Sequence, residues 1–224
     1  MNGFFITGTD TGVGKTWTSM GLLEVFNQQA LTTIAMKPVA SGCDATAEGL
    51  RNEDADLLMK VMSAEASYDE VNPYAYAPAI APHLAAEQVG ETIDIDNIIQ
   101  QAKQLSTRAD RIVIEGAGGW LVPLNDDKTF ADLAVALELP VILVVAIRLG
   151  CINHALLSVE SIQCSGLPIA GWVANTGLPE CESCGDTQAN INTLSARLSA
   201  PLLGTLPKLN GIATQIADRL KITT

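Results

Sequence analysis

The sequence has few of the features that mark nucleic-acid-binding or membrane proteins. Only 13 of its 224 residues are Lys or Arg, against 25 Asp and Glu, which gives a formal net charge of −12. This charge repels phosphodiester backbones and the basic residues form no cluster, so we expect no nucleic-acid partner. No apolar run reaches the roughly 18–20 residues that a membrane-spanning helix needs. We therefore predict a soluble globular protein without a membrane partner.

The N-terminal segment MNGFFITGTD lacks the basic flank and long apolar stretch of a signal peptide. The five cysteines, Cys43, Cys151, Cys164, Cys181 and Cys184, are an odd number, which predicts free thiols rather than a disulfide framework. Together these features predict a cytoplasmic protein. Cys181 and Cys184 form a C-x-x-C, for which a metal or redox role is the alternative. A structural zinc site needs four ligands, however, and neither of the two histidines lies near this pair.

Short β-branched runs alternate with segments of helical length along the chain. The predicted strands are residues 3–7, 32–37, 111–115, 140–146, 168–175 and 201–206. This alternation predicts a mostly parallel sheet with helices on both faces. The run 140–146 is apolar almost throughout, as expected of a central strand. No repeat or long linker divides the sequence, and the proline-rich stretch 72–82 is too short to separate domains, so we predict a single domain over residues 1–224.

A glycine-rich loop follows the first predicted strand. Residues 8–16 read GTDTGVGKT and precede a good helical stretch, WTSMGLLEVFNQQ. Glycines let backbone N–H groups converge on phosphate oxygens, Lys15 can reach the terminal phosphates, and the Thr16 hydroxyl can bind Mg²⁺. Counted from Gly8, the spacing is one residue longer than G-x-x-x-x-G-K-[ST], so the loop is a variant of that motif. The alternative is an ordinary glycine-rich turn, but the strand, loop and helix context favours a nucleotide site on a three-layer α/β fold of the P-loop NTPase type.

Two acidic residues are candidates for the metal. Glu115 ends the strand 111–115 and is followed by Gly116, Gly118 and Gly119. Strand ends in open α/β sheets face the ligand crevice, where a carboxylate can bind Mg²⁺. Asp54 lies near the start of the helical stretch NEDADLLMKVM, where an acid is equally expected as a partner of the helix dipole. The pattern alone favours a role for Glu115 and leaves Asp54 open.

Further blocks complete a pattern that resembles one enzyme family. They are GTDTGVGKT (8–16), MKPVASG (36–42), EGLRNEDA (48–55), VNPY (71–74), EGAGGW (115–120), LPVILVV (139–145), LGCINHALL (149–157) and GWVANT (171–176). In this order they resemble the dethiobiotin synthetases from residue 6 to about 206. The loop alone would indicate only a nucleotide-binding superfamily, whereas the combination is highly specific. The resemblance implies an ATP- and Mg²⁺-dependent ligase of biotin biosynthesis that converts 7,8-diaminopelargonic acid, CO₂ and ATP to dethiobiotin, ADP and phosphate.

The resemblance also assigns roles to individual positions. The implied metal ligands are Thr16, Asp54 and Glu115, and the implied catalytic group is Lys37, with Lys15 and Thr11 beside the reacting atoms. The implied ATP contacts are Gly12, Val13, Gly14, Lys15, Thr16, Trp17, Asp54, Glu115, Gly116, Ala117, Gly118, Asn175, Thr176, Gly204, Thr205, Leu206 and Gly211, with Asn175 reading the adenine. The implied substrate contacts are Ser41 and, from the neighbouring subunit of a homodimer, Gly150, Cys151 and Asn153 at a helix N-terminus.

Two departures from the family pattern and two rival interpretations remain. Gly12 stands where some relatives carry glutamate, and residues 177–190 do not align with the family. The main rival is a P-loop switch ATPase that positions cellular cargo on the same fold. The switch ATPases carry a lysine at the position of Asp10, and the acidic net charge of this sequence also disfavours that interpretation. The second rival is a non-catalytic nucleotide-binding scaffold, but that interpretation does not explain the retained Lys15, Thr16 and Lys37.

Overall fold

The computed structural model describes residues 1–181, 185–208 and 212–222. Within these residues the main sheet has six strands in the order β10-β9-β8-β1-β7-β2, and every neighbouring pair is parallel. The strands are β1 (Gly3–Gly8), β2 (Thr33–Met36), β7 (Arg111–Glu115), β8 (Val141–Ala146), β9 (Ile169–Asn175) and β10 (Leu202–Leu206). Each coincides with one of the strands predicted from the sequence. The apolar strand β8 lies inside the sheet between β9 and β1, which confirms its predicted central position.

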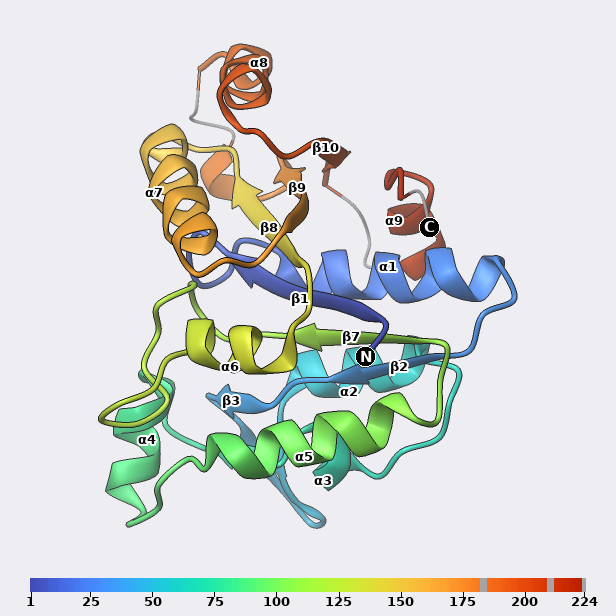
Figure 1. Ribbon diagram of the computed structural model, residues 1–224, viewed down its shortest axis with the longest axis vertical. Helices are drawn as coiled ribbons and strands as arrows, with labels where there is room; N and C mark the ends of the chain where they lie inside the picture. Colours follow the sequence, from blue (N-terminus) through green and yellow to red (C-terminus); the bar gives the residue numbers. More distant parts are fainter. Residues whose placement is uncertain (182–184, 209–211, 223–224) are drawn as a thin grey trace.

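Helices cover both faces of this sheet (Figure 1). One face packs against α1 (Lys15–Gln28), α2 (Glu53–Val61) and α9 (Ala213–Ala217). The other face packs against α5 (Ile95–Ser106) and α6 (Phe130–Leu137) and, beside them, α7 (Cys151–Cys164) and α8 (Thr187–Arg197). The predicted three-layer α/β fold is therefore confirmed.

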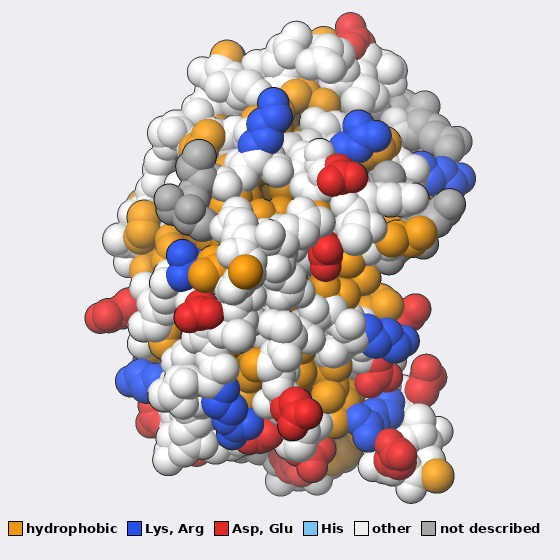
Figure 2. Space-filling model, turned by 90° about the vertical axis from the view of Figure 1, so that its right-hand side faces the viewer, with side chains coloured by type: hydrophobic (Ala, Val, Ile, Leu, Met, Phe, Trp, Pro, Cys, Tyr) orange, Lys and Arg blue, Asp and Glu red, His pale blue; other side chains and the backbone are white. Residues whose placement is uncertain are grey.

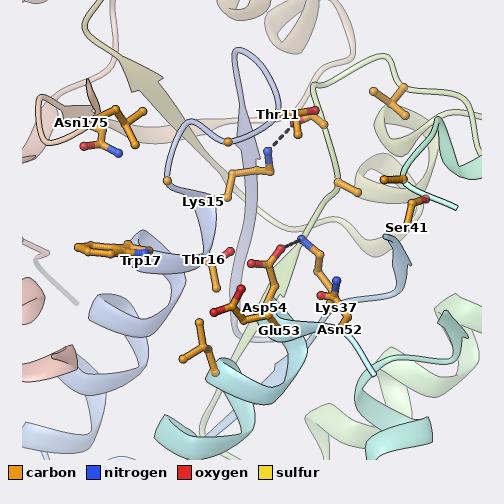
Figure 3. Close-up of a pocket in the computed structure, with 18 of the residues that line it drawn as sticks. Thr11, Lys15, Thr16, Trp17, Lys37, Ser41, Asn52, Glu53, Asp54 and Asn175 are labelled. Atoms are coloured by element: carbon orange, nitrogen blue, oxygen red, sulfur yellow. Dashed lines mark hydrogen bonds and ion pairs between the residues drawn. The ribbon is translucent and has the colours of Figure 1, made fainter. Parts of the chain in front are cut away.

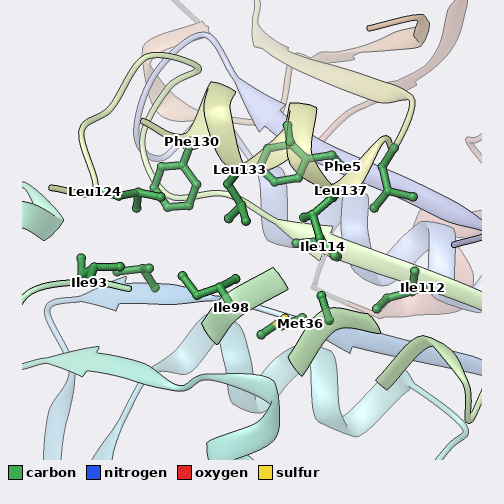
Figure 4. Close-up of a cluster of buried hydrophobic side chains, with 14 of the residues drawn as sticks. Phe5, Met36, Ile93, Ile98, Ile112, Ile114, Leu124, Phe130, Leu133 and Leu137 are labelled. Carbon is green, nitrogen blue, oxygen red and sulfur yellow. The ribbon is translucent and has the colours of Figure 1, made fainter. Parts of the chain in front are cut away.

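The two faces arise from the period-two alternation of side chains along each strand. In β7, Ile112 and Ile114 point to the layer of α5 and α6, whereas Val113 points to the layer of α1. Figure 4 shows the first of these cores, in which Ile98 of α5 and Phe130 of α6 pack with the strand residues. Burial on both faces explains why these strands are apolar nearly throughout their length.

The smaller elements were not predicted. The stretch after β2 forms β3 (Val39–Ser41), which pairs in parallel with β6 (Tyr74–Tyr76), and the hairpin of β4 (Asp44–Thr46) with β5 (Gly49–Arg51). The remaining elements are α3 (Tyr68–Val71), α4 (Pro82–Gln88) and the short 3₁₀ helix η1 (Pro179–Cys181). The proline-rich stretch 72–82 thus contains one strand and the start of one helix.

The surface carries charged side chains of both signs. On the face in Figure 2, the Lys and Arg side chains lie among Asp and Glu side chains rather than gathering in a patch of their own. Among the described residues, no helix combines the length and apolar character needed to cross a lipid bilayer.

Candidate active site

The phosphate loop lies between β1 and α1. Gly14 is the N-cap of α1 and has a φ of 98°, in the left-handed region that favours glycine. The first helical hydrogen bond runs from Thr18 N to Gly14 O, so the amides of Lys15, Thr16 and Trp17 have no partner within the helix. These amides and the positive end of the helix dipole form a binding site for an anion. Gly12 also has a positive φ of 72°, and a Cβ there would meet no atom within 4 Å. The glycine in place of glutamate therefore leaves the loop intact.

Lys15 ties the phosphate loop to the segment after β7. Its Nζ donates to the carbonyl oxygens of Asp10, at 2.9 Å, and Gly118, at 2.7 Å. The side chain is buried, and burial lowers the pKa of Lys15 to about 8, with a further contribution from the nearby Lys37 ammonium. The same Asp10 accepts from Thr11 N through Oδ1 and from Arg148 through Oδ2. Asp10 therefore stabilises the conformation of the phosphate loop through hydrogen bonds within the same chain.

Glu115 is the centre of a buried polar network. It is wholly buried, and its Oε1 accepts from Thr16 Oγ1 at 2.9 Å and from Lys37 Nζ at 2.7 Å. Its Oε2 accepts from Ser19 Oγ at 2.7 Å. Sequence reasoning missed Ser19, although a helix that begins at Lys15 places residue i+4 on the same face. Helical spacing was the signal that could have identified it.

The strand register brings Lys37 to Glu115. In the pairing of β2 with β7, Met36 lies opposite Ile114, so the next residues, Lys37 and Glu115, leave the sheet side by side. Lys37 Nζ also donates to Asp54 Oδ2 at 3.0 Å and to Gly116 O at 3.3 Å. Burial alone would lower the pKa of Lys37, but the carboxylates of Glu115 and Asp54 outweigh that effect and raise it. Lys37 is therefore a buried, charged ammonium group.

Asp54 lies in the first turn of α2, as predicted. Asn52 caps that helix by accepting from Ala55 N, and this fixes the position of the Asp54 side chain. The Asp54 side chain is 40% exposed and borders the cavity described below. Burial acts to raise the pKa of the Asp54 carboxyl, but the Lys37 ammonium and the Thr16 hydroxyl outweigh it and lower the pKa. The helix-dipole explanation for Asp54 is thus incomplete, because the residue also contacts Lys37.

A cavity of about 830 Å³ opens over these groups (Figure 3). The predicted site residues that line it are Thr11, Gly12, Gly14, Lys15, Thr16, Trp17, Lys37, Ser41, Asp54, Ala117, Gly118 and Asn175. Residues that the sequence did not indicate also line it, namely Asn52, Glu53, Leu57, Ala79, Ile80, Ala81, Pro82, Val122, Gly177, Leu178, Pro207 and Lys208. Many of the latter are apolar, and an apolar wall gives no distinctive sequence pattern.

Other predicted contacts lie beside or away from the cavity. Those outside its lining are Val13, Glu115, Gly116, Thr176, Gly204, Thr205 and Leu206. Glu115 lies beneath the floor, and Thr176 N donates to Leu206 O, which holds the ends of β9 and β10 together. Gly150, Cys151 and Asn153 lie at the start of α7 and do not line this cavity. Gly211 and Cys184 fall outside the described residues, so their predicted roles remain untested.

Asn175, at the end of β9, contacts the phosphate loop directly. Its Nδ2 donates to Val13 O at 2.9 Å, and its Oδ1 accepts from Gly177 N at 3.0 Å. A Cβ on Gly14 would lie 2.3 Å from this Nδ2, so the loop needs glycine there for close approach as well as for its φ. An amide has two N–H donors and two oxygen lone pairs. One donor and one lone pair of Asn175 therefore remain to face the cavity.

The donor set suits a small, hard dication. Thr16, Asp54 and Glu115 offer one hydroxyl and two carboxylates, and hydrogen bonds or ion pairs already connect them through Lys37. Among the described residues, no cluster of three or more His, Cys, Asp and Glu forms a self-contained metal cage. Mg²⁺ is commonly held by one or two carboxylates together with substrate phosphates rather than by such a cage. The residues present fit that mode of binding.

Comparisons with known proteins show the family of this chain. The sequence matches a family model described as "AAA domain" over residues 2–215. It is 51% identical over 212 residues to the ATP-dependent dethiobiotin synthetase BioD of Marinobacter nauticus, covering 94% of this chain and 90% of that protein. A second ATP-dependent dethiobiotin synthetase BioD, from Chromohalobacter salexigens, is 51% identical over 215 residues, with 93% and 91% covered. This chain belongs to the dethiobiotin synthetase family.

Membership of the dethiobiotin synthetases confirms the family predicted from the sequence blocks. Among solved structures, the MinC:MinD cell division protein complex of Aquifex aeolicus has a TM-score of 0.60 at 14% identity, covering 97% of this chain and 86% of that one. A likeness at this identity shows the P-loop NTPase fold alone. The switch-ATPase interpretation therefore shares only the fold, whereas the synthetases share half of the residues along nearly the whole chain.

Proposed function

We propose that this chain is an ATP-dependent ring-closing ligase that forms dethiobiotin, ADP and phosphate from 7,8-diaminopelargonic acid, CO₂ and ATP, the penultimate step of biotin biosynthesis. One observation carries this proposal. Two buried ammonium groups, Lys15 and Lys37, come close together beneath a single cavity, in a chain that belongs to the dethiobiotin synthetase family. Lys15 belongs to the phosphate loop, whereas Lys37 directly follows β2 and lies at the part of the cavity where a second reactant would bind.

The phosphate loop binds and orients ATP. The amides at the start of α1 and the Lys15 ammonium hold the β- and γ-phosphates, and the remaining donor and lone pair of Asn175 read the adenine edge. Backbone groups around Ala117 and Gly118 complete the wall near the terminal phosphate. The alignment of phosphates by fixed donors is the main source of rate in phosphoryl transfer, so no protein nucleophile is needed.

The reaction requires three chemical steps. One amine of the diamine adds to CO₂ and loses a proton, giving a carbamate. A carbamate oxygen then attacks the γ-phosphorus and displaces ADP, which leaves a mixed carbamic-phosphoric anhydride. The second amine attacks the carbonyl carbon, closes the ring and expels phosphate. Lys37 and Lys15 neutralise the charge that gathers on the oxygens during the second step, with Thr11 beside them.

Magnesium is the metal that this donor set fits. Thr16, Asp54 and Glu115 would hold it together with the phosphate oxygens of ATP. Bound there, Mg²⁺ supplies charge neutralisation to the transferred phosphoryl group. Lys37 contacts two of these residues, so its ammonium and the metal site share the carboxylates of Asp54 and Glu115.

The organic substrate occupies the half of the cavity beyond Lys37. Ser41 borders this half, and its Oγ is buried without a hydrogen-bond partner among the described residues, so it is available to a substrate group. The start of α7 offers the backbone N–H groups of Gly150 and Asn153 to a carboxylate, and Cys151, whose N–H donates to Arg148 O at 3.0 Å, lies between them. Because these residues do not line the cavity of their own chain, we place them at the substrate site of a partner subunit in a homodimer. Leu149, just before α7, and Leu157, within it, are 93% and 57% exposed and provide apolar surface for such a contact between subunits.

We also propose that residues 1–224 act as one catalytic domain in the cytoplasm. The compartment rests on chemistry: the enzyme consumes ATP, and Cys43 and Cys164 are free thiols, which a reducing compartment preserves.

Mass spectrometry tests the reaction. Purified protein incubated with diaminopelargonic acid, bicarbonate and MgATP should form dethiobiotin, and omission of the diamine should leave ATP hydrolysis slow. With ¹⁸O-bicarbonate, under conditions where exchange with water is slow, label should pass into the released phosphate, because the attacking carbamate oxygen leaves with it. Phosphate labelled only from water, released regardless of the diamine and stimulated by DNA or lipid, would instead support a switch ATPase.

A further inference from the structure

Trp17 differs from the other two tryptophans of the chain. Trp120 and Trp172 are 4% and 0% exposed, whereas Trp17 is partly buried and lines the cavity. Part of its indole packs against the hydrophobic cluster on the α1 side of the sheet, which also includes Leu178. The remaining indole surface therefore faces the cavity. A large aromatic ring left partly open to a ligand cavity has unsatisfied stacking capacity.

Trp17 stands on one side of the phosphate loop, and the proposed reaction centre stands on the other. Figure 3 shows Trp17 and Asn175 together on one side of Lys15 and Thr16, with Lys37 and Ser41 on the opposite side. The amide of Trp17 belongs to the same first turn of α1 that offers its donors to phosphate. A nucleotide with its terminal phosphates toward Lys37 must therefore lead its ribose and base toward Trp17 and Asn175.

Part of the cavity wall around Trp17 is apolar. Leu178 and Pro207, from the segments after β9 and β10, line the cavity on this side. These two segments touch at Gly177, where a Cβ would lie 2.6 Å from Lys208 N and from the Pro207 carbonyl group. The close approach fixes the position of this wall relative to the indole. Leu178, Pro207 and the indole thus form apolar walls, with the polar residues Asn175 and Lys208 beside them, and such a recess suits a flat heteroaromatic ring.

We propose that the Trp17 indole is the stacking surface for the nucleobase of the bound nucleotide, and that it supplies affinity without selecting the base. This inference rests on the proposed binding of ATP in this cavity and adds the group that binds the base. Every nucleobase has a π face, so stacking tolerates all of them. Discrimination comes from Asn175, whose remaining N–H and oxygen match N7 and N6 of adenine, whereas guanine presents two acceptors, N7 and O6.

Two substitutions separate stacking from simple apolar packing. Trp17→Phe keeps an aromatic face, whereas Trp17→Leu keeps apolar bulk but removes the aromatic face. In the Leu variant the Kd values for ATP and GTP should both rise by roughly 5- to 100-fold, the loss that corresponds to removal of an aromatic partner for one base. The ratio of the two Kd values should stay constant, and the Phe variant should recover most of the affinity. Titration calorimetry with ATP, GTP and adenosine measures these values.

Fluorescence gives a readout that does not depend on turnover. Nucleotide binding should quench or shift the tryptophan emission of the wild type, and this change should disappear in Trp17→Phe, which keeps the two buried tryptophans. If the Leu variant is poorly folded, the comparison of wild type with the Phe variant still tests the contact. Unchanged ATP affinity in Trp17→Leu, or the same emission change in Trp17→Phe, would overturn the inference.

The stacking role of Trp17 and the formation of dethiobiotin can be tested separately. Dethiobiotin formation by the wild type with no effect of Trp17 substitution on affinity or emission would reject the stacking role alone. Trp17-dependent nucleotide binding without any dethiobiotin formation would keep the stacking role and reject the proposed reaction.

Discussion

Lys37 Nζ lies 2.7 Å from Glu115 Oε1, and the two side chains are only 4% and 0% exposed. Removing Glu115 takes away one of the two carboxylates that pair with the buried Lys37 ammonium, since Asp54 remains at 3.0 Å. Loss of one partner from a buried ion pair costs far more than the pair itself contributes. The consequence for stability can be measured independently of activity.

Glu115→Ala should lower the free energy of unfolding by about 3–5 kcal/mol. Glu48→Ala is the matched control, because Glu48 pairs with Arg51 at the surface, with a side chain that is 76% exposed. That change should cost less than about 1 kcal/mol. Urea unfolding followed by circular dichroism measures both values. Equal losses in the two variants would contradict the view that the Lys37–Glu115 pair is held in a desolvated environment.

Substitution of Lys37 and substitution of Lys15 should have different effects on kcat and on ATP binding. Lys37→Ala should lower kcat by roughly 10²- to 10³-fold, as expected when one positioned donor to transition-state charge is lost, with ATP binding largely kept. Lys15→Ala should weaken ATP binding as well, because Lys15 belongs to the phosphate loop. Steady-state kinetics together with calorimetric ATP titration separates these outcomes. Full activity of the Lys37 variant would rule out its proposed role.

Gly14→Ala should impair nucleotide binding through two effects. The new Cβ would lie 2.3 Å from Asn175 Nδ2, and a φ of 98° is strained for alanine. The control is Gly166→Ala, at the end of α7, where φ is 83° but a Cβ meets nothing within 4 Å. It should cost about 1–2 kcal/mol of stability through strain alone and leave ATP affinity unchanged. The comparison needs only thermal unfolding and an ATP titration of each variant.

The pair of Glu70 with Arg108 should make a small pH-dependent contribution to stability. The Arg108 guanidinium, the Ser67 amide and the Ser67 hydroxyl lower the pKa of Glu70 to about 2. Because the folded-state pKa lies below the unfolded value, the contribution is complete above about pH 4.5 and is lost as the pH falls toward 2. Both side chains are substantially exposed, so solvent screening keeps the effect small.

Glu70→Gln should therefore be less stable than wild type at pH 6, and the difference in stability should narrow steadily as the pH falls from 4.5 toward 2. The exposed neighbour Asp69 provides the control, since Asp69→Asn removes a charge from the same short helix without touching Arg108. Unfolding curves across this pH range show whether the difference narrows only for Glu70. A difference independent of pH would show that the ion pair is not its source.

The sheet was predictable from the sequence because its strands are buried on both faces. Residues 112–114 and 141–146 are apolar and mostly β-branched, a pattern that can be recognised without knowledge of the neighbouring strands. The pair β3 with β6 was not predictable, since each strand has three residues and contains little beyond Ala, Ser and Tyr. Short strands of this kind depend on the surrounding packing for their conformation.

The site was predictable in its members but not in its contacts. The glycine-rich loop signals Lys15 and Thr16 by spacing alone, and the family pattern indicated Lys37 and Asp54. The contact between Lys37 and Glu115 depends on the register of β2 against β7, which no local pattern encodes. The contact of Asn175 with Val13 similarly depends on the order of the strands across the sheet.

Thr16 and Glu115 are joined by a hydrogen bond although 99 residues separate them in the chain. The nucleotide site therefore exists only after β1, β2 and β7 have come together, so loop-closure entropy must be overcome before any ligand can bind. ATP should consequently bind only the folded state of the chain and thereby stabilise the whole sheet against unfolding. At a free concentration 100 times its Kd, such a ligand adds about 2.7 kcal/mol to the free energy of unfolding. The cellular ATP level thus becomes a determinant of how long this chain survives proteolysis.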